Sequence, residues 1–86
     1  MDRQTNAHRS PHYGALQEVI DSLFDDEERV RRLDVVMAAE ASDLPEDLLE
    51  IVNLLPPGTF TRQRLCDQLN SSIAGHAWGQ VYGTVL

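Results

Sequence analysis

The sequence predicts an all-α domain, a compact bundle of four to five short helices. Three observations support this fold class. Apolar residues recur three and four positions apart along most of the chain, capping residues precede several of these runs, and proline or glycine follows them. A length of 86 residues suits one core but not two. We therefore expect a flexible polar tail over residues 1–9 and a single helical domain over residues 10–86.

The first helix is expected to begin at Ser10. The Ser10 hydroxyl can cap the helix, and Pro11 then occupies the first helical position, where a missing N–H costs nothing. An apolar stripe follows and should face the core. Its members are Tyr13, Leu16, Ile20 and Leu23.

The second helix is expected to begin at Asp25 and to run to about Ala41. Asp25 and Glu28 have the spacing of a capping box, and the acids after Asp25 suit the positive end of the helix dipole. The buried stripe of this helix should consist of Val30, Leu33, Val36 and Met37.

The third helix should follow Ser42–Asp43, with Pro45 in its first turn, and should end before Pro56–Pro57. Its apolar residues repeat with helical spacing, so they should be buried. They are Leu48, Ile51, Val52 and Leu55.

The fourth helix should begin after Thr61, which can cap it, while Phe60 and Leu65 have the spacing of a hydrophobic staple. Asn70–Ser71–Ser72 is interpreted as the turn that ends this helix. Its inward residues should be Leu65, Cys66 and Leu69.

Residues 76–86 fit two structures. A helix gives them an apolar face that repeats every four residues, and it places His76, Gln80 and Thr84 on another face. A strand suits the composition from Gly79 onward. We favour the helix, because a lone strand has no evident pairing partner.

The charge is concentrated in the middle of the chain. The net charge is −7, and residues 18–50 contribute −9 of it, with +1 on either side. An acidic face can steer a basic protein partner, and a domain this small also suits a homodimer. Tryptophan and tyrosine often anchor interfaces, although in so small a domain they can equally fill the core. The candidate partner-binding residues are Asp25, Asp26, Glu27, Glu28, Trp78 and Tyr82.

The residue patterns argue against catalysis. The sequence has no nucleophile with a base and an orienting partner, no metal-ligand cluster and no glycine-rich phosphate loop. We therefore expect no catalytic residue, no metal, no cofactor and no small-molecule substrate. A single cysteine, with no apolar run long enough to span a membrane, favours a cytoplasmic protein that does not bind membranes. A non-enzymatic protein-binding or regulatory module is the leading hypothesis.

Residues 48–86 resemble a helix-turn-helix domain. The resemblance lies in the Gly58-Thr-Phe-Thr61 entry, the helix with inward leucines, the turn and a final helix. It implies a DNA-binding transcriptional regulator, acting as a dimer. The residues that it would place toward DNA are Arg62, Gln63, Arg64, His76, Gln80 and Thr84. By size and acidity the chain is also similar to inhibitor proteins encoded by phages and mobile elements, which is a second alternative.

Overall fold

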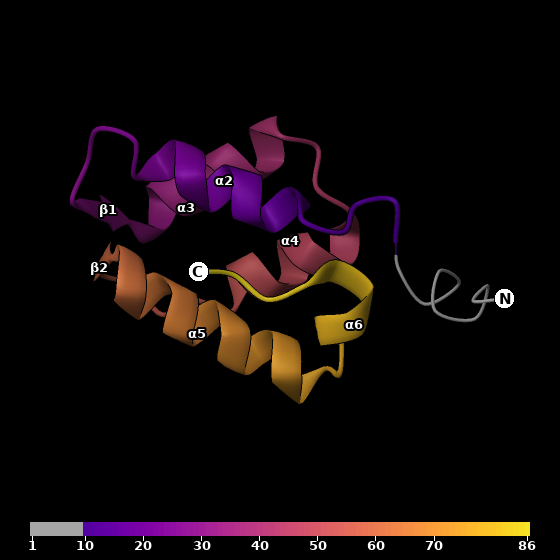
Figure 1. Cartoon of the computed structure of the whole chain (residues 1–86). Coiled ribbons are helices and arrows are strands. Elements are labelled where there is room, and N and C mark those ends of the chain that lie inside the picture. The colour runs from indigo at the N-terminus through magenta and orange to yellow at the C-terminus, as the bar shows by residue number, and fades with distance from the viewer. Residues whose placement is uncertain (1–9) are drawn as a thin grey trace, which may run out of the picture.

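The computed structural model describes residues 10–86, and Figure 1 shows how their elements are arranged. The expected tail over residues 1–9 lies outside the described residues. The described part consists of two helix–strand–helix units and a C-terminal extension. The first unit is α2 (Ala15–Leu23), β1 (Arg29–Arg31) and α3 (Arg32–Ala41); the second is α4 (Glu46–Asn53), β2 (Thr59–Thr61) and α5 (Arg62–Gly75); α6 (Gly79–Tyr82) follows.

The protein is mostly helical, as expected, but it is not purely all-α. Strands β1 and β2 pair in an antiparallel two-stranded sheet, with Val30 opposite Phe60. Both of these central side chains are buried, whereas the flanking residues of each strand are exposed. Alternation of polar and apolar residues around a β-branched or aromatic centre suits a strand with one covered face.

The expectation of a helix beginning at Asp25 was therefore wrong. Residues 26–28 form a loop, residues 29–31 form β1, and α3 begins only at Arg32. The pairing with β2 supplies backbone hydrogen bonds that outweigh the local helix-start signal. A capping interaction does exist, but its carboxylate comes from Asp34 and not from Glu28, six residues earlier. The Arg31 N–H donates to Asp34 Oδ2 at 2.9 Å.

Arg32 joins the two units next to this sheet. Its Nε donates to the Leu55 carbonyl at 2.8 Å, and its Nη2 donates to the Asn53 carbonyl at 2.9 Å. The Arg32 backbone N–H donates to the Gly58 carbonyl at 3.1 Å. A cation placed on the carbonyls at the end of α4 complements the negative end of that helix. The start of α3 is thereby fixed against the end of α4.

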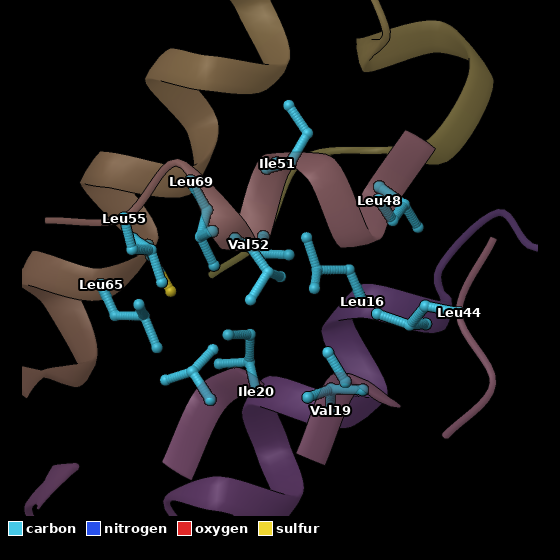
Figure 2. Packing of buried hydrophobic residues seen from close by; sticks show 14 of the residues in the cluster. Leu16, Val19, Ile20, Leu44, Leu48, Ile51, Val52, Leu55, Leu65 and Leu69 are labelled. Carbon is cyan, nitrogen blue, oxygen red and sulfur yellow. The ribbon is translucent and has the colours of Figure 1, made fainter. Parts of the chain in front are cut away.

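The core lies where α2, α4 and α5 converge, and Figure 2 shows their side chains pointing toward one another. Leu16 and Ile20 come from α2, Ile51 from α4, and Leu65 and Leu69 from α5, and all are essentially inaccessible to solvent. The expected third helix and the inward face of the fourth are confirmed. Thr61 also caps α5 as expected, since its Oγ1 accepts from the Arg64 N–H at 3.3 Å.

The buried stripe expected for the second helix was only partly right. Val30 is buried, but from the strand, and Val36 is partly buried. Leu33 and Met37 are 55% and 58% exposed. The buried residues of α3 are Val35 and Ala39, because the late helix start turns a different face toward the core.

The boundaries of two other helices also differ from expectation. Residues 11–14 form turns, and α2 begins only at Ala15, after Gly14 in the left-handed region with φ of 85°. The Ser10 hydroxyl accepts from the His12 N–H and so caps a turn, and Tyr13 is 44% exposed instead of buried. Helix α5 continues through Asn70–Ser72 to Gly75, because Ile73 adds another buried side chain to its inner face.

The C-terminal segment is neither a long helix nor a paired strand. Helix α6 has four residues, and residues 83–86 are extended. Figure 1 shows this segment running back from α6 between α2 and α5. Gly83, with φ of 85°, makes the turn from helix to extended chain.

The layout of the core can be tested by truncation. Ile51→Ala and Leu65→Ala should each lower the free energy of unfolding by about 2–5 kcal/mol, because each side chain is fully buried. Denaturant unfolding followed by circular dichroism measures the loss. Gln80→Ala, at an exposed position of α6, is the control and should change stability by less than about 0.5 kcal/mol. Equal losses in all three variants would contradict this core.

Candidate functional site

The outward side of α3 carries two large apolar side chains in solvent. Leu33 and Met37 are four residues apart, so they lie one turn apart on the same face, and Glu40 continues that face. Asp34 flanks it with a partly exposed carboxylate. We call these four residues the α3 surface. It faces away from Val35 and Ala39, which attach the helix to the core.

A hollow lies at the start of this surface. It has a volume of about 340 Å³, and Leu33 and Pro57 supply apolar atoms to it. Arg31 also lines it, and Arg31 Nε lies 3.7 Å from Asp34 Oδ2 in an exposed ion pair. An apolar side chain of a partner could fill this hollow, with polar groups beside it. Side chains that anchor an interface typically occupy such pockets.

Negative charge predominates along the chain segment that contains the α3 surface, although the hollow itself is lined by two arginines, Arg31 and Arg32. Residues 25–40 carry six acids and three arginines, which gives 3 − 6 = −3. The sequence-predicted acids form the exposed loop between α2 and β1, and no ion pair involves them within the described residues. The structure thus places the acidic candidates at the end of the molecule where α3 begins. These candidates are Asp25, Asp26, Glu27 and Glu28.

The aromatic candidates lie elsewhere and are mostly covered. Tyr82 is 8% exposed, and its hydroxyl donates to Asp47 Oδ2 at 2.9 Å. Trp78 is partly buried against the core, with its ring stacked on His76 at a centroid distance of 4.8 Å. The edge-to-face contact of Trp78 with Tyr82 has a centroid distance of 6.0 Å. Core packing therefore accounts for Tyr82, and Trp78 is only partly exposed to solvent.

The candidates for DNA contact fall at two ends of α5. Arg62, Gln63 and Arg64 form its first turn, whereas His76 follows its last residue, about 20 Å away at a rise of 1.5 Å per residue. Gln80 is exposed on α6, and Thr84 is exposed on the extended segment.

Arg62 is already engaged within the molecule. Its guanidinium donates to Asp21 Oδ1, and through Nε and Nη2 to the main-chain oxygen of Leu86 at 3.0 and 2.9 Å. The hydrogen bond from Arg62 lowers the pKa of the Asp21 carboxyl, and the one from Gln17 adds to the effect. Arg64, in contrast, is exposed and has no carboxylate partner within residues 10–86.

The described residues hold no cluster of metal-binding side chains. Residues 10–86 contain no group of three or more His, Cys, Asp or Glu that could hold a metal ion. Burial raises the pKa of the Cys66 thiol, which disfavours the reactive thiolate. None of the described helices is long and apolar enough to span a bilayer.

Comparison of the chain with protein-family models, curated proteins and solved structures found no match. The candidate site therefore depends on the geometry alone.

Sequence reasoning missed the α3 surface because it assigned Leu33 and Met37 to the core. A signal was present in the Arg-Val-Arg alternation of residues 29–31, which matches the Thr-Phe-Thr of residues 59–61. Pairing these two segments delays the start of α3 and changes which of its faces is covered.

The burial of Tyr82 can be tested by its titration. Its pKa is raised above the ordinary value of 10.0, first by burial and then by the hydrogen bond to Asp47. Its phenolate should therefore form late in an ultraviolet absorbance titration, and Tyr82→Phe should remove that late transition. Because the unfolded state releases the proton first, stability should fall as the pH rises through 10.0 toward the folded value. An unchanged final phase in Tyr82→Phe would show that Tyr82 is not buried.

Proposed function

We propose that the protein is a non-enzymatic protein-binding module, and that its α3 surface binds a basic partner segment with apolar anchors. The observation that carries the proposal is the exposure of Leu33 and Met37, at 55% and 58%, one turn apart on a helix fixed at its start. Burial of such side chains in an interface is favourable, because apolar surface leaves water.

Charge complementarity defines the partner. The α3 surface has a carboxylate on its flank, Asp34, and another on its face, Glu40, and the exposed loop of four acids precedes β1. A positively charged segment would be attracted at long range by the net charge of −7 and at short range by these groups. An amphipathic helix with leucines on one face and lysines on the other combines both features. This is the class of ligand that we expect the α3 surface to bind.

The test uses a synthetic amphipathic helical peptide of leucine and lysine, with a peptide of leucine and glutamate as its matched control. We expect saturable binding of the lysine peptide only, measured by fluorescence anisotropy. The double variant Leu33→Ser/Met37→Ser should bind it at least about tenfold more weakly, because the apolar anchors are lost. Both substitutions lie at exposed positions, so the fold should remain intact.

Leu86→Ser is the matched control variant. The Leu86 side chain is 84% exposed and does not border the hollow near α3. This variant should bind the lysine peptide as the unchanged chain does. A similar loss of affinity in Leu86→Ser, or no loss in the double variant, would contradict the α3 surface as the binding site.

A DNA-binding regulator, of the kind implied by the helix-turn-helix resemblance, is the second candidate. One observation favours it. Arg29 and Arg64 are exposed without carboxylate partners within the described residues, and they lie at the same end of the sheet. Arg29 is opposite Thr61, whose hydroxyl caps the turn that contains Arg64. Two free guanidinium groups could contact phosphates, and a dimer would double their number.

An electrophoretic mobility-shift titration on random duplex DNA separates the two candidates. If the protein-binding proposal is right, no shift is expected even at low salt, since the net charge of −7 opposes binding to phosphates. A shift that falls steeply with salt and disappears in Arg29→Ala/Arg64→Ala would instead support DNA binding. Gln68→Ala, an uncharged change at an exposed position of the same helix, is the control for that variant.

A further inference from the structure

The extended segment Gly83–Leu86 is held in the manner of a bound peptide. Figure 1 shows it between α2 and α5, where it pairs with neither strand of the sheet. Up to Tyr82, main-chain hydrogen bonds fasten the chain, since Gly14 N donates to the Tyr82 carbonyl at 3.1 Å and Ser10 N donates to the Val81 carbonyl at 3.0 Å. Beyond Gly83, the hydrogen bonds to the main chain come from side chains.

Asn70 on α5 recognises the main chain of Val85. Its Nδ2 donates to the Val85 carbonyl at 2.8 Å, and its Oδ1 accepts from the Val85 N–H at 2.8 Å. With these two hydrogen bonds, the Asn70 amide takes the place of the residue that would lie opposite Val85 in a hydrogen-bonded antiparallel pair. This contact is specific for an extended backbone and makes no demand on the side chain of residue 85.

Gln17 on α2 and Arg62 on α5 recognise the main chain of Leu86. Gln17 Oε1 accepts from the Leu86 N–H at 2.8 Å, and Gln17 Nε2 donates to the main-chain oxygen of Leu86 at 3.0 Å. Arg62 donates to the same oxygen through Nε and Nη2. Asp21 accepts hydrogen bonds from both Gln17 and Arg62, and so orients the two donors toward that oxygen.

Side-chain selectivity at this groove comes from one position. Val85 is 2% exposed and belongs to the core cluster, whereas Leu86 is 84% exposed. A hollow of about 430 Å³ lies beside the two residues and is lined by α5 residues, including Asn70 and Cys66. A ligand therefore needs a small apolar residue for the Val85 position and an extended backbone around it.

We propose that the groove between α2 and α5 is a binding site for an extended segment of a partner protein, and that residues 83–86 occupy it as a displaceable internal ligand. The partner segment has a small β-branched residue at the position of Val85. Glycine is favoured at position 83, where the segment turns away from α6, because φ is 85° and a Cβ there would lie 3.3 Å from Cζ of the Tyr13 ring. This groove and the α3 surface share no residue, so the two proposals stand independently.

Hydrogen exchange of the unchanged chain tests whether the internal ligand can leave. The Val85 amide should exchange through an opening that does not require unfolding, at least about 100-fold faster than the amide of Leu69 in the middle of α5. Exchange of the two amides with the same opening free energy would overturn the proposal, because residues 83–86 would then leave only when the whole domain unfolds.

Peptide binding tests whether the vacated groove accepts another chain. Val85→Asp should release the segment, since a carboxylate cannot remain buried there without a partner, and Thr84→Asp is the matched control at an exposed position. The probe is the acetylated peptide Gly-Thr-Val-Leu, followed by NMR chemical-shift changes. We expect saturable binding to Val85→Asp but not to Thr84→Asp, where the tethered segment competes at a high effective concentration.

The recognition residue provides the last control. Adding Asn70→Ala to Val85→Asp should abolish peptide binding. Absence of binding to a folded Val85→Asp, or binding that does not depend on Asn70, would overturn the proposal, and the exchange experiment decides the matter if Val85→Asp does not fold. A concentration-dependent dimer of the unchanged chain by light scattering, lost in Val85→Asp, would assign the groove to a second copy and not to a partner.

Discussion

The antiparallel pairing of β1 with β2 is the constraint on which the rest of the structure depends. It joins segments thirty residues apart, buries Val30 and Phe60 side by side, and sets the residue at which α3 and α5 each begin. Arg32 reinforces it by bridging to the carbonyls at the end of α4. Without this pairing, the helix-start signal at Asp25 would favour a longer helix that includes Val30.

The same constraint exposes the surface to which we assign partner binding. A helix that began at Asp25 would have used Leu33 and Met37 as core residues, whereas the helix that begins at Arg32 buries Val35 and Ala39. The apolar residues left in solvent belong to the same chain segment as the exposed loop of four acids. Apolar side chains on a segment of net negative charge suit a basic amphipathic ligand better than a nucleic acid.

The C-terminal segment follows a different principle, since neither helix nor sheet hydrogen bonds hold residues 83–86. Three side chains, Gln17, Arg62 and Asn70, provide the polar contacts, and Val85 provides the apolar one. Contacts of this kind can be exchanged one for one with those of another extended chain. The groove that we propose as a binding site is therefore occupied by the chain itself, whereas Leu33 and Met37 of the α3 surface are exposed to solvent.

The sequence by itself determined the elements whose signals are local. Thr61 as the cap of α5, the apolar face of α4 and the inward residues Leu65, Cys66 and Leu69 follow from spacing within one turn or two. Only the tertiary structure decided where α3 begins, that Asn70 continues a helix, and that residues 83–86 are extended. Each of these depends on a contact between distant segments: Val30 with Phe60 in the first case, Asn70 with Val85 in the last. Hydrogen bonds between distant segments can outweigh a local preference of about 1 kcal/mol, and no local window of sequence contains them.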